Sequence, residues 1–135
     1  MLNVDEFEAW NVLRYEKGQH YYAHHDYFDP ELFNEYKQNP WTQRHYTLLV
    51  YLSEPEDGGE TVFPWEGRYR DQDPGFQFES CDFGVRVRPK KGDAVFFESL
   101  YPDHSLDKHS LHAGCPVSKG TKWVATKWIR VGQYP

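Results

Sequence analysis

The sequence predicts a mainly β domain, a sandwich or barrel built from many short strands. Turn signals such as Asp57-Gly58-Gly59 and Lys91-Gly92-Asp93 recur at short intervals along the chain. The segments between them are rich in β-branched and aromatic residues. Several of these segments alternate with period two, which is typical of strands that have one buried face. At 135 residues the chain has the length of one domain, and we expect residues 1–135 to form it.

Six segments carry the clearest strand pattern. In chain order they are residues 9–15, 46–52, 61–63, 85–87, 94–97 and 123–131. The best helix candidate is residues 30–36, about two turns long, with Asp29 as its N-cap and Pro30 at its first position. Residues 64–80 are expected to form a long loop, and a loop of this length inside a compact domain usually serves a function.

Composition narrows the classes of function. With 39% hydrophobic and 27% charged residues, the chain can form a folded core. No apolar run reaches the length of a membrane span, and residues 1–5 show no pattern of a signal peptide. The net charge of −6 and the lack of a basic stripe argue against nucleic acid as a partner. No pattern in the sequence indicates an oligomeric state.

His24 and Asp26 form the first candidate metal site. On a strand, residues i and i+2 point to the same side, so these two side chains converge and His25 points away. One imidazole and one carboxylate are two of the three ligands of a facial triad, which binds Fe(II) and leaves positions open for a cosubstrate and O₂. An isolated H-x-D pattern also occurs among ordinary surface residues, so this interpretation requires a second histidine from elsewhere.

Four downstream histidines could complete the triad, namely His45, His104, His109 and His112. We favour His112, because small residues in its neighbourhood (residues 110–117) let a backbone approach closely. It also precedes the strongest strand pattern of the chain.

A buried cation is expected near such a metal. An Fe(II) oxygenase needs two further electrons, commonly from 2-oxoglutarate, whose far carboxylate must meet a buried Lys or Arg because an unpaired buried carboxylate is costly. The last strand offers Lys122 and Lys127, which alternation places on opposite faces. We favour Lys122, on the face of Thr126 and Trp128, and expect Lys127 to point outward. An isolated strand lysine is otherwise most often solvated.

Eight blocks of sequence carry a family resemblance when they are taken together. They are residues 12–19, 24–28, 43–44, 51–53, 58–64, 91–94, 111–117 and 120–128. In this order and spacing they resemble the prolyl 4-hydroxylases, and among these most closely the plant and algal type. These proteins are Fe(II)/2-oxoglutarate dioxygenases with the double-stranded β-helix, or jelly-roll, fold. The resemblance implies this fold, without the family's N-terminal helices, in a chain that is N-terminally truncated or naturally short.

The resemblance also implies roles for individual residues. The iron ligands would be His24, Asp26 and His112, and Lys122 would pair with the far carboxylate of 2-oxoglutarate. The rest of the cosubstrate pocket would comprise Tyr15 and Thr61 as hydrogen-bonding residues and Trp128 as a lining residue.

Three further residues, Glu8, Tyr21 and Arg44, match positions in the family's peptide groove. Cys81 and Cys115 match a pair that is bridged in the plant and algal type, with two free thiols as the alternative. A bridge would fit the lumen of the endoplasmic reticulum or Golgi. The residue two positions after the pocket tryptophan is often histidine in the family, and here it is Arg130.

The reaction implied is hydroxylation of a peptidyl proline to 4-hydroxyproline. It would use Fe(II), 2-oxoglutarate and O₂, release succinate and CO₂, and be supported by ascorbate. The substrate would be a proline-rich peptide in polyproline II form, held by aromatic side chains. Candidates for this lining, each of which could instead pack in the core, are Tyr21, Tyr27, Phe28, Trp65 and Tyr69. Two alternatives stay open: a related dioxygenase that modifies another residue or protein, and a non-catalytic jelly roll that binds peptides.

Overall fold

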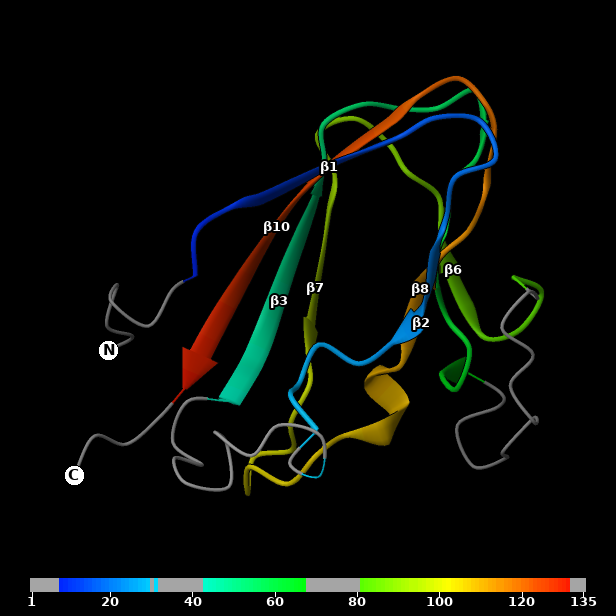
Figure 1. Cartoon of the computed structure of the whole chain (residues 1–135). Coiled ribbons are helices and arrows are strands. Elements are labelled where there is room, and N and C mark those ends of the chain that lie inside the picture. The colour runs from blue at the N-terminus through cyan, green and yellow to red at the C-terminus, as the bar shows by residue number, and fades with distance from the viewer. Residues whose placement is uncertain (1–7, 30, 32–42, 68–80, 132–135) are drawn as a thin grey trace.

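Two four-stranded antiparallel sheets face each other in the structure, a computed structural model that describes residues 8–29, 31, 43–67 and 81–131. Figure 1 shows β10, β3 and β7 on one side and β2, β8 and β6 on the other. Within the described residues, no helix has the length and apolar character that crossing a membrane requires. The arrangement confirms the predicted jelly roll.

The longer strands form the first sheet. Its order is β1 (Asn11–Tyr15), β10 (Lys122–Val131), β3 (Gln43–Tyr51) and β7 (Ala94–Glu98). In this sheet Tyr15 lies opposite Lys122 on β1 and β10, and Trp128 lies opposite Thr47 on β10 and β3. Because side chains alternate along a strand, this register fixes which of them face the second sheet.

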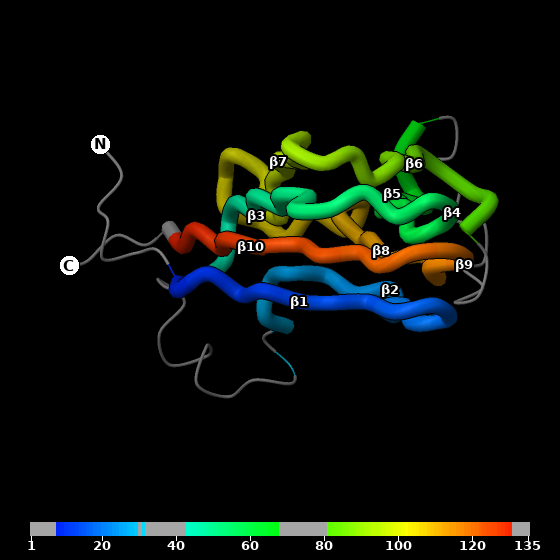
Figure 2. Tube along the Cα trace, turned by 90° about the horizontal axis from the view of Figure 1, so that it is seen from above, coloured from blue at the N-terminus to red at the C-terminus, as the bar shows by residue number. Residues whose placement is uncertain are grey.

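Shorter strands form the second sheet, in the order β2 (Tyr21–His24), β8 (His112–Gly114), β5 (Thr61–Phe63) and β6 (Val85–Val87). In its first pair, His24 lies opposite His112. A separate two-stranded ladder pairs β4 (Asp57–Gly58) with β9 (Val117–Lys119), at one end of the molecule in Figure 2. A short 3₁₀ helix, η3 (Lys108–Ser110), precedes β8, and the Asp107 carboxylate caps it by accepting a bond from the His109 amide.

Side chains from both sheets meet between them. The hydroxyls of Tyr51 on β3 and Thr61 on β5 are hydrogen-bonded at 2.7 Å, and both residues are buried. The rings of Phe97 on β7 and Phe63 on β5 pack edge to face, with centroids 5.1 Å apart. These contacts set the separation of the sheets beside the candidate site.

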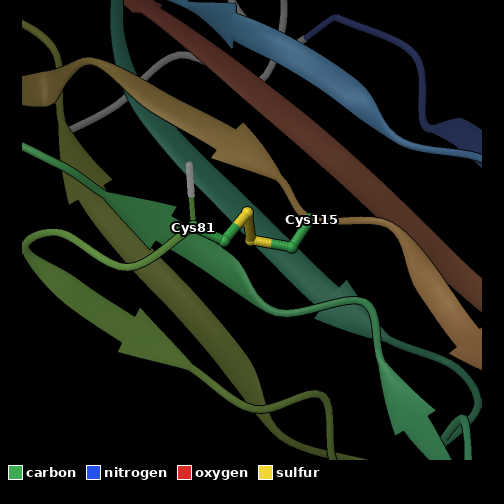
Figure 3. Close-up of a disulfide and its surroundings, with 2 residues drawn as sticks. All are labelled: Cys81 and Cys115. Carbon is green, nitrogen blue, oxygen red and sulfur yellow. A yellow bond between two sulfur atoms is a disulfide. The ribbon is translucent and has the colours of Figure 1, made fainter. Parts of the chain in front are cut away.

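A disulfide joins Cys81 and Cys115 on the second sheet (Figure 3), which confirms the predicted pairing. Cys115 follows β8 directly, and it is buried with Val62 and Ala113. The bond therefore ties the strand that carries His112 to the segment before β6.

The predicted strands agree with the structure to within a few residues, and those at 61–63 and 85–87 agree in full. Four short strands were not among the six predicted segments, namely β2, β4, β8 and β9. Most of the predicted helix at residues 30–36 lies outside the described residues, as do residues 68–80 of the predicted loop, including Tyr69. At the predicted N-cap, the Asp29 side chain accepts a hydrogen bond of 2.8 Å from the Glu31 amide.

Candidate active site

A pocket lies between the two sheets and encloses about 550 Å³, its open mouth included. The first sheet contributes nine residues of β1, β3 and β10 to its wall, namely Asn11, Leu13, Tyr15, Thr47, Leu49, Lys122, Val124, Thr126 and Trp128. The opposite wall contains Tyr21, His24, Asp26, Thr61, His112, Ala113 and Gly114. The alternating residues 122, 124, 126 and 128 of β10 thus all face the pocket, as period-two alternation predicted. Lys127 points to the other face, where its ammonium group lies over the Trp10 ring.

The three predicted metal ligands lie together in this pocket. Asp26 Oδ1 is 3.3 Å from His24 Nε2 and 3.4 Å from His112 Nε2. The ligand atoms of all three residues lie within 4.8 Å of one another. Nitrogen and oxygen ligands about 2.1 Å from one metal ion lie about 3 Å apart when they bind at right angles. The two distances from Asp26 Oδ1 to the histidine nitrogens are therefore close to those between neighbouring positions around a single ion.

Backbone carbonyls orient both imidazoles. His24 Nδ1 donates to the carbonyl oxygen of Tyr22 at 2.7 Å, and His112 Nδ1 donates to that of Ser110 at 2.8 Å. A carbonyl oxygen can only accept, so each Nδ1 carries a proton and each Nε2 is the atom left for a metal. Both Nε2 atoms are turned toward Asp26, which is the arrangement that a metal ion requires.

Asp26 is almost fully buried, with 4% of its surface exposed. Its second oxygen, Oδ2, accepts a hydrogen bond of 2.6 Å from the hydroxyl of Thr47 on the opposite sheet. Burial alone would raise the pKa of Asp26, but its interactions with His112, His24 and Thr47 outweigh burial and hold that pKa well below its usual range. The carboxylate is thus ionised and fixed, with Oδ1 directed to the histidines.

The other histidines considered for the triad lie elsewhere. His45 stacks on Tyr46, and His104 contacts the edge of the His45 ring. His109 bonds to Asp107 beside η3. Among the described residues, His24, Asp26 and His112 are the group of histidines and acids that is close enough to hold a metal.

Lys122 lies in the same pocket and is 3% exposed. Burial lowers the pKa of Lys122 to about 8, an effect that the nearby Glu60 opposes. Its ammonium nitrogen is 5.1 Å from the centre of the Tyr15 ring, and no carboxylate in the described part of the chain forms an ion pair with it. A buried ammonium group with this environment is a receptor for an anion that enters the pocket.

Residues with hydroxyl groups share the pocket with Lys122. Tyr15 and Thr61 both line it. Burial, with a smaller contribution from Tyr21, raises the pKa of Tyr15 to about 12, so its phenol stays neutral and can donate a hydrogen bond. At Gly59, an added Cβ would lie 3.2 Å from Lys122 Cδ, so a side chain there would crowd the lysine stem.

The candidate peptide-groove residues lie at other parts of the rim. Tyr21 lines the pocket, and its ring is 4.4 Å from that of His24. Glu8 and Arg44 form an ion pair of 2.6 Å, and the Arg44 guanidinium lies 3.9 Å from the centre of the Trp128 ring. Trp128 lines the pocket, and its buried indole N–H meets no acceptor within the ranges described.

Sequence reasoning did not select Thr47 or Asn11 for the site. It placed Thr126 on the inward face of the last strand with Lys122, which the structure bears out, but gave it no role. The contact of Thr47 with Asp26 depends on how the two sheets are placed against each other, and no local pattern of either strand indicates it.

The family of the chain follows from comparison with known proteins. Residues 10–130 match the model of the 2OG-Fe(II) oxygenase superfamily. The chain belongs to this superfamily. It is 45% identical over 131 residues to prolyl 4-hydroxylase 13 of Arabidopsis thaliana, an alignment that covers 96% of this chain and 45% of that protein. Over 123 residues it is 47% identical to probable prolyl 4-hydroxylase 9 of the same plant, covering 91% of this chain and 41% of that protein.

Comparison with solved structures shows that the chain has the fold of this superfamily. The viral collagen prolyl hydroxylase of Paramecium Bursaria Chlorella virus-1, in its 2OG complex, superposes with a TM-score of 0.71 at 38% identity, over 94% of this chain and 60% of that one. A Pseudomonas putida prolyl-4-hydroxylase shares the fold, with a TM-score of 0.55 at 24% identity over 96% of this chain and 54% of that one. The chain spans about half the length of the relatives that it matches.

The residues present fit the two groups that give the superfamily its name. Two imidazole nitrogens and one carboxylate oxygen are the donor set of non-haem Fe(II) oxygenases. The buried ammonium group of Lys122 suits the far carboxylate of 2-oxoglutarate. Because both features open into one pocket, the metal and the cosubstrate can be neighbours.

Proposed function

We propose that this chain is the catalytic domain of a peptidyl-prolyl 4-hydroxylase. The observation that carries the proposal is the buried Lys122, which opens into the same pocket as the His24, Asp26 and His112 cluster. The similarity to prolyl 4-hydroxylases over nearly the whole chain supports proline as the residue that is modified. In this proposal residues 1–135 form one domain.

Three residues would hold the metal, namely His24, Asp26 and His112. Bound Fe(II), with 2-oxoglutarate and O₂, supplies the oxidising power for hydroxylation of a C–H bond, and succinate and CO₂ are released. Tyr22 and Ser110 carbonyls keep the imidazole Nε2 atoms free for the metal. The Thr47 hydroxyl keeps the Asp26 carboxylate from turning. These contacts pre-organise the ligands and leave one side of the cluster open to the pocket.

Lys122 would pair with the far carboxylate of 2-oxoglutarate. Tyr15 and Thr61 would donate hydrogen bonds to the same carboxylate, and Trp128 would close another part of the pocket. Charge-assisted hydrogen bonds in a buried site are strong, and a buried cation is costly until an anion arrives. The site therefore selects an acid of a length that reaches from Lys122 to the metal.

The peptide would bind at the rim, where Glu8, Tyr21 and Arg44 lie. A proline-rich peptide in polyproline II form is stiff, so little conformational entropy is lost when it binds. Tyr27, Phe28 and Trp65 are the described aromatic candidates for its wall. We expect ascorbate to support turnover, as in the prolyl 4-hydroxylases that the sequence resembles. The Cys81–Cys115 disulfide supports the proposal that the protein acts in an oxidising compartment, such as the lumen of the endoplasmic reticulum or Golgi.

The decisive experiment measures succinate formation from 2-oxoglutarate with Fe(II), with and without a proline-rich peptide, and the mass of the peptide product. We expect stimulation by the peptide and one added oxygen on proline. His112→Ala is expected to abolish both signals. His20→Ala is the matched control, because His20 is exposed and lies outside the pocket.

Other results would replace the proposal. Oxygen found on a residue other than proline would favour a related dioxygenase with another target. Peptide binding without succinate, in protein that binds Fe(II) and 2-oxoglutarate, would favour a non-catalytic peptide-binding module.

A further inference from the structure

A three-residue charge cluster lies beside Trp128, outside the pocket wall. The Glu8 carboxylate accepts hydrogen bonds from Arg44 Nε and Nη2 at 2.6 and 2.7 Å. It also accepts one from Arg130 Nε at 3.0 Å. The last strand has a register shift between Ile129 and Arg130, which places Arg130 opposite Arg44. Two guanidinium groups thus share one carboxylate.

Aromatic rings and one amide hold this cluster in place. The Arg44 guanidinium lies 3.9 Å from the centre of the Trp128 ring and 4.6 Å from that of Phe28. Arg130 lies 5.1 Å from the Phe28 ring centre. The Gln43 side chain bonds both the amide and the carbonyl of Phe28, at 2.7 and 2.8 Å. The backbone of Phe28, whose ring contacts both arginines, is therefore held by Gln43.

The sharing leaves Arg44 incompletely neutralised. Glu8 Oε2 serves both arginines, and these two arginines help to lower the pKa of Glu8 against the effect of its burial. Arg44 uses Nε and Nη2 for Glu8, and within the described ranges no acceptor bonds its Nη1 group. Its side chain is 18% exposed, so a ligand at the rim can reach it. A guanidinium group that is already oriented, and whose charge is only partly neutralised, can bind a second carboxylate.

We propose that Arg130 is a positioning residue. By binding the Glu8 carboxylate, it leaves part of the positive charge of Arg44 unneutralised and so makes Arg44 selective for an anionic peptide. The inference rests on the proposed function, and it names the substrate class as proline-rich peptides with an acidic residue beside the reacting proline. Arg44 makes the contact, and Arg130 acts through Glu8. Without Arg130, the Glu8 carboxylate would pair with Arg44 alone. The net charge of that pair is zero, so it would not attract an acidic peptide.

Three proline-rich peptides of equal length test the inference. They differ at one position beside the central proline, which carries Glu, Gln or Lys. Dissociation constants from titration of fluorescently labelled peptide give the preference directly, and succinate release gives KM and kcat. We expect the Glu peptide to bind about three- to tenfold more tightly than the Gln peptide and the Lys peptide to bind most weakly. Higher ionic strength should reduce this preference, because the cluster is partly exposed.

Variants separate the role of Arg130 from a merely structural one. In Arg130→Gln, the Glu peptide and the Gln peptide should bind with nearly equal dissociation constants. The variant should change KM for the Glu peptide and leave kcat unchanged. Arg130→Lys should keep part of the preference, because it retains the charge without the geometry of the guanidinium. Arg14→Gln is the matched control, since Arg14 is exposed on β1 and pairs with Glu16 away from the cluster. It should keep the wild-type ratio.

Two results would overturn the inference while the proposed function stands. One is hydroxylation of all three peptides with equal dissociation constants. The other is an unchanged Glu preference in Arg130→Gln. If the wild-type chain binds none of the peptides and none stimulates succinate release, the inference and the proposed function fail together.

Discussion

The two sheets that face each other across the pocket keep their side chains in place by different means. The first, β1-β10-β3-β7, has the longer strands, paired in register except for one shift between Ile129 and Arg130, and its outer face carries exposed apolar side chains, with Val12 at 50%, Phe96 at 58% and Trp123 at 41%. The second, β2-β8-β5-β6, has short strands, and the Cys81–Cys115 bond lies with buried Val62 and Ala113. Lys122 and Thr47 come from the first sheet, and the two histidines come from the second.

This difference shows where a substitution can change function without changing the fold. In the first sheet, ladder pairing with β1 fixes the backbone at Lys122, and β10 is paired with β3 from Val124 onward, so the Lys122 side chain can be exchanged with little effect on the strand. In the second sheet, each imidazole is oriented by a single backbone carbonyl, and the disulfide ties the strand that carries His112 to the segment before β6. Disruption of that sheet should therefore affect stability and metal binding together.

The largest effect is expected for Lys122→Met in the first sheet. Without the ammonium group, the far carboxylate of 2-oxoglutarate has no cation, and its affinity should fall about 100-fold or more. The same variant should raise the free energy of unfolding of the ligand-free protein by about 1–3 kcal/mol, because a buried charge is removed. Titration with 2-oxoglutarate and urea unfolding measure the two effects.

Lys127→Met provides the matched control, because Lys127 lies on the opposite face of the same strand. It should leave the affinity for 2-oxoglutarate unchanged. Retention of wild-type affinity by Lys122→Met would remove the central argument for the site.

In the second sheet, replacement of both Cys81 and Cys115 by serine should lower the free energy of unfolding. The bond closes a loop with a sequence separation of 34. In the chain-entropy model that corresponds to about 4 kcal/mol. Metal affinity should fall as well, since Cys115 follows the strand that carries His112. Denaturant unfolding with and without reductant is the measurement, and the double variant should show no response to reductant. A fully stable double variant with normal metal binding would contradict the contrast between the sheets.

A smaller effect is expected where the first sheet supports the second. Thr47→Val keeps the shape of the side chain but removes the bond to Asp26 Oδ2. Loss of such an outer contact to a metal ligand typically weakens metal binding about 10- to 100-fold. Anaerobic titration with Fe(II) checks this, and Thr121→Val, outside the pocket, is the control. Equal Fe(II) affinity in both variants would mean that Asp26 needs no support from the opposite sheet.

The sequence predicted the first sheet's contribution better than the contacts between sheets. Alternation along one strand is enough to place Lys122 and Trp128 on a common inner face. His24 and Asp26 lie together as expected, but β2 ends at His24 and Asp26 follows it in a bend, so strand alternation is not what joins them. Choosing His112 over three other histidines needed the small-residue context and the family resemblance. The bond from Thr47 to Asp26 and the sharing of Glu8 by Arg44 and Arg130 arise only when distant segments come together.

The smallest effect concerns the pH dependence of stability in the ligand-free protein. The pKa of Lys122 is about 8 in the folded chain and has an ordinary value of 10.5. Between these values the unfolded chain binds more protons, so the free energy of unfolding should rise with pH, by at most about 1.4 kcal/mol per pH unit. Tyr15 and Tyr51 have pKa values raised from 10.0 to about 12 in the folded chain. Above about pH 10 the unfolded chain therefore loses these protons first, and the stabilisation that the two neutral phenols provide is lost as the pH rises.

The expected curve therefore rises above about pH 8 and turns down above about pH 10. Urea unfolding across this range measures it, and Lys122→Met supplies the comparison, because it should lack the rise and keep the fall. The same rise in both proteins would show that Lys122 is solvated in solution. In that case Lys122 would not be a buried, unpaired cation that binds an anion, and the first sheet would no longer differ from the second by carrying such a group.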